Sequence, residues 1–527
     1  MRLGIDFGTT RTVVACADRG NYPVLGFVDD AGDSHDYFPS VVAERDGELR
    51  FGFDALAAAD DDASFTAVRS FKRLLADGTS GPGRVVRIGS TTIALDELVT
   101  RFLVATKEAV LTRSNLPDEL RGEDATEMQS VVAVPANASG AQRLVTLDAF
   151  RRGGFQPLAL LNEPSAAGFE YTHRHRDTLT SKRDHVVVYD LGGGTFDASL
   201  VRMRGKTHEV LATAGVNHLG GDDFDAVLVD LVLARLSLKR EALDARMLER
   251  LADQCRDAKE RLNPSSRKIS IDLELALGER ASVTEAVIPV ADFYEACAPL
   301  VERSIEAMVP VMAGLESAIA GDVESALSEI AGIYVVGGAS ELPIVARALR
   351  QRFGRRVHRS PYPSAAIAIG LAIACDEAAG FELSDRYSRT FGVFRESAAG
   401  AEVVFDPIFT HGTELPSRAA GPIRRRRDYR AAHNLGHFRF FECTAITDDG
   451  RPRGDLMISG DVLFPFDAQL GAGSVDLRSV PVERLAARAR GPRIEEEYSL
   501  DENGIVAVTI KNLESGLERV FRLGSVG

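Results

Sequence analysis

The first 375 residues alternate between short apolar runs and segments with helical periodicity. Runs such as HVVVYD are typical of buried strands, whereas the spacing in FDAVLVDLVLARL predicts an amphipathic helix. Strands are expected at residues 1–16 (two, joined by a Gly-Thr-Thr turn), 130–135, 185–190 and 333–338. Helices are expected at 95–112, 141–152, 342–353 and 365–375, and over most of 223–262. This alternation predicts an α/β architecture.

The character of the chain changes after Cys375. Residues 377–386 are acidic and predict a linker. Short strand-like runs separated by Gly, Pro and Asp follow from 387 to 527, namely TFGVF, EVVFDPIF, FRFFECTAI, DLMISGDVLF, EEEYSL and IVAVTIKN. They predict an all-β domain with a sandwich architecture. We therefore expect domains at 1–376 and 387–527, joined by the linker at 377–386.

Composition narrows the possible partners and compartment. The formal net charge is −15, which disfavours general nucleic-acid binding. The five cysteines occur singly, without a CxxC pair, which fits a reducing cytoplasm better than a disulfide framework. The longest apolar run, residues 365–375, is too short for a bilayer span. The chain has one concentrated run of basic residues, Arg424–Arg427. That run is interpreted either as a solvated loop or as a contact for an anionic partner.

Two segments share a pattern of strand, aspartate, glycine turn and second strand. They are LGIDFGTTRTVVACA at 3–17 and VVYDLGGGTFDASLV at 187–201. Either turn alone could be a flexible connection, but the pair predicts two related halves that face each other. Glycine has no Cβ, so backbone N–H groups of both turns could approach one phosphate. Asp6, Asp190 and Asp197 would then converge on a Mg²⁺ ion.

The order of these and other motifs resembles the seventy-kilodalton heat-shock chaperones, of the actin-like ATPase superfamily. The similar segments are GIDFGTTRT, FKRLL, VAVPANASGAQR, LLNEPSAAGFEY, VVVYDLGGGTFDASLV, ATAGVNHLGGDDFD, CRDAKERL and VVGGASELP. The resemblance implies a duplicated actin-like ATPase domain, with two lobes around a nucleotide cleft, followed by the all-β sandwich. It also implies ATP or ADP and Mg²⁺ as cofactors.

The resemblance carries residue roles with it. The catalytic residues would be Lys72, Glu163, Asp190 and Asp197, and the metal would be held by Asp6, Asp190 and Asp197, mostly through its waters. Pro135 and Arg143 would relay nucleotide state between domains. The nucleotide-binding residues would be Gly8, Thr9, Thr10, Arg11, Gly192, Gly193, Gly194, Thr195, Gly220, Gly221, Asp222, Lys259, Gly337, Gly338 and Ala339. Without the resemblance, Lys72 would be taken for a surface lysine and Glu163 for a helix N-terminal acid.

The chain departs from the family pattern around the adenosine. Glu260 and Glu341 stand where the family has arginines that stack on the base. A carboxylate does not offer the stacking contact of a guanidinium, so we expect weaker adenine-nucleotide affinity than the family norm. Three further departures are Arg256 for a glutamate, Asn263 for a serine and Ser364 for an aspartate.

The second half departs as well. The family's linker is a run of leucines and valines, but here it has only Phe381 and Leu383. The β-domain matches best at PRIEEEYSLDENGIVAVTIKNLESG, and its peptide-enclosing loops have no clear counterpart. The family's helical lid, roughly another hundred residues, is absent from this sequence, so a groove without it should exchange substrate quickly.

The leading hypothesis is a cytoplasmic, slow ATPase of the heat-shock type that binds unfolded or extended polypeptide in a lidless β-domain, with possible co-chaperones. The alternative is a nucleotide-dependent scaffold that docks one specific protein partner. A third hypothesis, a small-molecule kinase, is disfavoured by the Lys72 and Glu163 segments and the appended β-domain. Neither nucleic acid nor a membrane is an expected partner.

Overall fold

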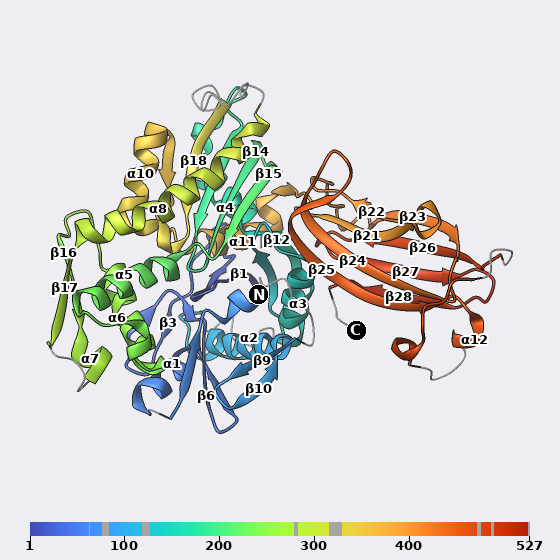
Figure 1. Ribbon diagram of the computed structural model, residues 1–527. Helices are drawn as coiled ribbons and strands as arrows, with labels where there is room; N and C mark the ends of the chain where they lie inside the picture. The colour runs from blue at the N-terminus through green and yellow to red at the C-terminus, as the bar shows by residue number, and fades with distance from the viewer. Residues whose placement is uncertain are drawn as a thin grey trace. The chain divides into compact units, whose positions relative to one another are not determined.

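The computed structural model describes residues 1–62, 64–75, 84–117, 127–278, 283–315, 329–471, 476–485 and 490–524. The chain forms two compact units, each assembled from segments distant in sequence (Figure 1). The first unit comprises Met1–Leu3, Gly26–Asn162 and Glu382–Gly527. The second comprises Gly4–Leu25 and Glu163–Phe381.

A mixed sheet organises the second unit, with the strand sequence β19-β18-β13-β14-β15. Strand β13 runs parallel to β18 and antiparallel to β14. The bounds are β13 (His185–Leu191), β14 (Thr195–Arg204), β15 (Thr207–Asn217), β18 (Ile330–Val336) and β19 (Val357–Arg359). The remaining strands are β2 (Arg11–Cys16), most of β1 (Arg2–Phe7), β16 (Lys268–Asp272) and β17 (Glu285–Pro289).

Helices share one buried core with this sheet, namely α5 (Gly221–Arg235), α6 (Ala245–Glu260), α7 (Leu273–Leu277), α8 (Val290–Met308) and α10 (Pro343–Phe353). Helices α4 (Glu163–Arg174) and α11 (Ala366–Cys375) pack against each other, and α4 also contacts β13 and β14. The apolar run that predicted a buried helix is α11, and nine of its ten residues are buried. Gly370 allows α11 to pack closely against α4, because a Cβ at this position would overlap the carbonyl of Ala166 on α4.

The N-terminal part of the first unit also mixes helices and strands. Helix α3 begins after Ser139, whose hydroxyl accepts a hydrogen bond from Gln142 N at 3.2 Å, as an N-cap does. The helices are α1 (Gly52–Asp61), α2 (Leu95–Thr112) and α3 (Gly140–Arg152). The strands are β3 (Phe27–Val28), β4 (Ser34–His35), β5 (Phe38–Pro39), β6 (Val41–Arg45), β7 (Glu48–Phe51), β8 (Thr66–Arg69), β9 (Val85–Ile88), β10 (Thr91–Ala94), β11 (Gln129–Val134) and β12 (Gln156–Asn162).

The C-terminal part of the first unit contains two four-stranded antiparallel sheets, ordered β22-β21-β24-β25 and β23-β26-β27-β28 (Figure 1, orange to red). Residues of both sheets, including Phe391, Phe440, Tyr498 and Val508, belong to a single buried core. The bounds are β20 (Glu382–Ser384), β21 (Thr390–Ser397), β22 (Glu402–Phe409), β23 (Ile423–Arg430), β24 (Leu435–Ile446), β25 (Pro452–Pro465), α12 (Ala468–Gly471), β26 (Arg493–Leu500), β27 (Val506–Asn512) and β28 (Glu518–Arg522).

The arginine run is a strand, and its interpretation as a loop was wrong. Arg424–Arg427 lie in β23, which pairs with β26 so that Arg426 is opposite Glu497 and Arg427 is opposite Glu496. Arg424 pairs with Glu497, and Arg426 pairs with Glu495. The row of carboxylates on β26 thus supplies cross-strand partners for arginines that would otherwise repel one another.

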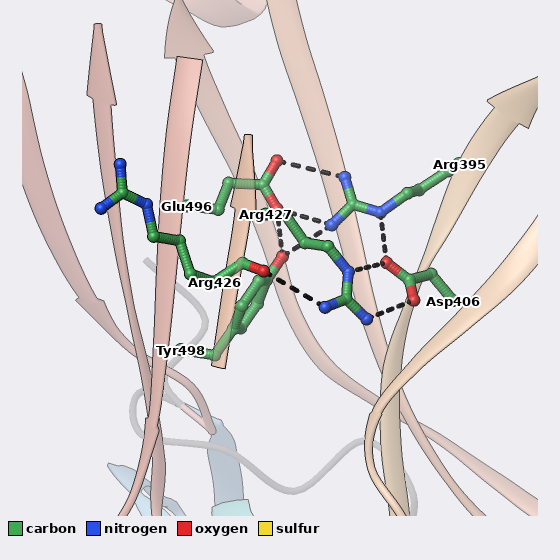
Figure 2. Close-up of polar contacts among 6 residues, drawn as sticks. All are labelled: Arg395, Asp406, Arg426, Arg427, Glu496 and Tyr498. Atoms are coloured by element: carbon green, nitrogen blue, oxygen red, sulfur yellow. Dashed lines mark hydrogen bonds and ion pairs between the residues drawn. The ribbon is translucent and has the colours of Figure 1, made fainter. Parts of the chain in front are cut away.

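One ion-pair cluster bridges the two C-terminal sheets (Figure 2). Arg395 of β21 donates to both oxygens of Glu496, at 3.1 and 2.6 Å. Asp406 of β22 accepts from Arg395 at 2.7 Å and from Arg427 at 2.9 Å through each of two nitrogens. Tyr498 donates its hydroxyl to Glu496. Although burial disfavours the charge of Arg395, its hydrogen bonds and ion pair with Glu496 raise its pKa, so this guanidinium stays charged.

We expect Glu496→Gln to destabilise the C-terminal sheets by about 3 kcal/mol, because it removes the charge of the fully buried carboxylate that pairs with Arg395. Glu497→Gln is the matched control on the same strand. Its partner Arg424 is 60% exposed, so its loss should cost below about 1 kcal/mol. Hydrogen exchange of peptides from residues 390–512 in the full chain measures both changes. Equal protection in the two variants would contradict a stabilising role for the cluster.

Candidate functional site

Three buried aspartates lie in the second unit at the predicted metal positions. Asp6 is near the end of β1, Asp190 is on β13 and Asp197 is on β14. Their exposed fractions are 8, 4 and 3%. Asp190 and Asp197 are direct cross-strand partners. Because burying two adjacent carboxylates as anions is costly, this pair favours the binding of a cation.

The two glycine turns are in contact. A Cβ on Gly193 would lie 2.7 Å from the hydroxyl oxygen of Thr10, and a Cβ on Gly220 would lie 2.6 Å from the backbone of Gly193 and Gly194. Real Cβ atoms do not approach that closely, so these positions require glycine. The turn after β1, the turn after β13 and the start of α5 therefore form one backbone cradle.

Hydrogen bonds fix the start of α5 to the second glycine turn. Gly221 N donates to Gly192 O at 2.9 Å, and Asp222 N donates to Gly193 O at 2.8 Å. Lys259 of α6 donates to Gly221 O at 2.9 Å, and its side chain is only 9% exposed. Helix α6 thus bonds the carbonyl of Gly221, while the N–H of the same residue bonds Gly192.

The loop after β18 completes this group. Gly337 has a φ of 84°, and a Cβ there would overlap a carboxylate oxygen of Asp190. Ala339 lies near Gly221, since a Cβ on the glycine would be 3.6 Å from the alanine's Cβ. Gly338 follows Gly337 at the surface. The structure therefore brings together the predicted residues from β1, β13, α5, α6 and β18.

The charged residues that depart from the family pattern are engaged in ion pairs. Glu260 pairs with Arg11, and Glu341 lies 3.6 Å from Arg359. Arg256 lies 2.9 Å from Asp253 and 3.3 Å from Asp225. Neither the Arg11–Glu260 pair nor the Arg256–Asp225 contact was predicted. The repeated acids in GGDDFD were the available signal for the second.

Residues 112–392 match the family model for Hsp70 protein, which covers 281 of the 527 residues. The chain belongs to the Hsp70 family. This confirms the family predicted from the motifs, and the structure confirms a mixed α/β chain. Hsp70 proteins are generally ATPases that bind ATP or ADP with Mg²⁺, and the family implies polypeptide substrates and co-chaperones. Membership therefore indicates a nucleotide-binding function of the chaperone type.

The described residues of this Hsp70 chain contain no group of three or more His, Cys, Asp or Glu side chains that could hold a metal ion directly. Metal binding through bridging waters and phosphate oxygens is compatible with that arrangement. No helix in the described ranges has the length and apolar character needed to cross a membrane.

Glu163 and Lys72 are both buried, with 6% of each exposed. Glu163 is the first residue of α4 in the second unit. Lys72 lies in a 3-10 helix, Phe71–Leu75, in the first unit. Burial excludes the interpretation of Lys72 as an ordinary surface lysine, because a buried ammonium requires polar partners.

The proposed relay residues lie in the first unit, and Arg143 is the centre of a buried polar network. Its guanidinium donates to the Asn162 side chain and, at 3.2 Å, to Asn503 O. Asn162 donates to Asp385 at 2.6 Å. Burial lowers the pKa of Arg143 and raises that of Asp385. Pro135 is buried directly after β11.

We expect Gly220→Ala to weaken binding of Mg·ADP by at least about tenfold, equivalent to about 1.4 kcal/mol. The added methyl group would collide with the backbone of Gly193 and Gly194 and displace the turn. Calorimetric titration measures the affinity, and circular dichroism checks that the fold is intact. Wild-type affinity in a folded variant would show that this close packing does not shape the nucleotide site.

Proposed function

We propose that this Hsp70 chain hydrolyses ATP and binds extended polypeptide segments in its C-terminal β-structure. The observation that carries the proposal is the backbone cradle of Thr10, Gly193 and Gly220 beside the buried pair Asp190 and Asp197. Backbone N–H groups in such a cradle suit phosphate oxygens, and buried carboxylates suit the waters of a Mg²⁺ ion. The residues present therefore fit a magnesium nucleotide.

The roles follow from the requirements of phosphoryl transfer, in which catalysis is mostly positioning and charge stabilisation. Bound Mg²⁺ would supply charge neutralisation at the phosphates. Thr9, Thr10 and Thr195 would donate hydroxyls to phosphate oxygens. Lys72 and Glu163 would orient the attacking water. The remaining contacts would come from the backbone of Gly8, Arg11, Gly192, Gly193, Gly194, Gly220, Gly221, Asp222, Gly337, Gly338 and Ala339, and from Lys259.

The architecture we propose is a duplicated actin-like ATPase domain at 1–376, a linker at 377–386 and a β-sandwich at 387–527. The resemblance between residues 3–17 and 187–201 supports the duplication. The single core shared by two four-stranded sheets supports the sandwich. A polypeptide would bind there in an extended conformation, with main-chain hydrogen bonds for affinity and pockets for specificity.

The Arg143 network supports a relay between the two functions. Asp385 lies in the proposed linker, and Asn162 directly precedes Glu163 in sequence, so Arg143 connects the linker with the segment that carries a proposed catalytic residue. The backbone N–H of Gly140, at the start of the same helix, donates to both oxygens of Glu442, each at 3.1 Å. Pro135 lies just before that helix.

We expect Lys72→Ala and Asp190→Asn each to reduce steady-state ATP hydrolysis by at least about 100-fold, because each removes a charge that positions the reacting groups. Extended apolar peptides should change the wild-type rate. Phosphate release with and without peptide measures both effects. Hydrolysis that needs both residues but ignores every peptide would favour the partner-specific scaffold instead. Unchanged hydrolysis in both variants would refute the proposed site.

We further expect the protein to discriminate only weakly between nucleotides that carry different bases. Glu260 and Glu341 are paired with Arg11 and Arg359, and neither provides a stacking guanidinium. Affinities for Mg·ADP and Mg·GDP should therefore differ by less than about tenfold, equivalent to about 1.4 kcal/mol. Parallel calorimetric titrations with the two nucleotides measure the ratio. An ADP preference above about 100-fold would require a base contact from other residues.

A further inference from the structure

We infer that Asp225 is a positioning residue for nucleotide binding, because it holds Lys259 and Arg256 beside the Gly220–Gly221 turn. The inference rests on the proposed nucleotide function. Asp225 lies on the first turns of α5, and both cationic side chains come from α6. Its action on the nucleotide is indirect and passes through Lys259, the one of the two side chains that donates a hydrogen bond to the turn.

The carboxylate of Asp225 is buried and forms ion pairs with both cations. Its side chain is 4% exposed, against 9% for Lys259 and 19% for Arg256. One oxygen lies 2.7 Å from Lys259 Nζ, and the other lies 3.3 Å from Arg256 Nε. A buried ammonium without a counter-charge is strongly destabilised, so Lys259 depends on this carboxylate to occupy its place.

Lys259 transmits this position to the glycine cradle. The same Nζ that pairs with Asp225 donates to Gly221 O at 2.9 Å. Gly221 N in turn donates to Gly192 O at 2.9 Å. A continuous chain of short contacts therefore runs from Asp225 to the turn that we propose binds phosphate. Small displacements at its start should alter the spacing of the phosphate donors.

Arg256 adds a second cation that Asp225 shares with other acids. Its guanidinium lies 2.9 Å from Asp253 and 3.6 Å from Asp222. Burial raises the pKa of Asp225, and the charges of Lys259 and Arg256 act in the opposite direction. The cluster is therefore balanced only while Asp225 is ionised, since two cations face it directly.

The test uses Asp225→Asn, which keeps the shape of the side chain and removes its charge. We expect the Kd and the KM for Mg·ATP to rise about tenfold while kcat changes less than about threefold, because contacting charged residues are strongly coupled. In a Lys259→Met background the same substitution should have less than about a threefold effect, because Asp225 acts through that lysine. A purely structural role would lower stability without this dependence on Lys259.

Asp230→Asn on the same helix is the matched control. Asp230 is 63% exposed and pairs with Arg240 at 2.7 Å, so its loss should leave nucleotide binding unchanged. If Asp225→Asn does not fold, Asp225→Glu carries the test. It keeps the charge but moves it by one methylene, and the Kd should rise at least about threefold.

The outcomes separate the inference from the proposed function. Wild-type protein that fails to bind Mg·ATP or Mg·ADP would refute the proposed function itself. If folded Asp225→Asn binds nucleotide as tightly as the wild type does, the positioning role alone is overturned. Where Asp225→Asn does not fold, wild-type affinity in Asp225→Glu has the same consequence. Equal losses from Asp225→Asn with and without Lys259 would also overturn it.

Discussion

The arrangement of the candidate site depends on glycines whose backbone packs against neighbouring residues too closely for a side chain to fit. Gly193 lies against Thr10, Gly220 lies against Gly193 and Gly194, and Gly337 lies against Asp190, each too close for a Cβ. Because these contacts join turns from different parts of the second unit, they fix the spacing of the aspartates and of Lys259 together. A larger residue at any of them would separate turns that the proposed phosphate contacts require side by side.

Much of the fold and the location of the site could be predicted because their signals are local. Helix α11 and strand β13 are nearly uniform apolar runs, and burial follows from composition alone. The glycine turns are recognisable for a related reason. A turn that must admit close backbone approach excludes most other residues, so Gly193 and Gly220 carry their structural requirement in the sequence itself.

The interactions that were missed join residues far apart in the chain. Arg424 is 73 positions from Glu497, and Arg11 is 249 positions from Glu260. Four consecutive arginines have no strong strand propensity, so β23 could not be predicted before β26 supplied its row of carboxylates. For the same reason the charge reversal at Glu260 was visible in the sequence, whereas its neutralisation by Arg11 was not.

These long-range pairs change how the departures from the family pattern are understood. Isolated charge substitutions at a binding site would leave unbalanced groups, which are costly when partly buried. Here Glu260 is matched by Arg11, Glu341 by Arg359, and Arg256 by Asp253 and Asp225. Each of these three charged residues therefore has a partner within the second unit, and the close glycine contacts around Asp190 are present as well. This balance is compatible with the proposed function, in which the phosphate contacts are kept and the contacts with the base are changed.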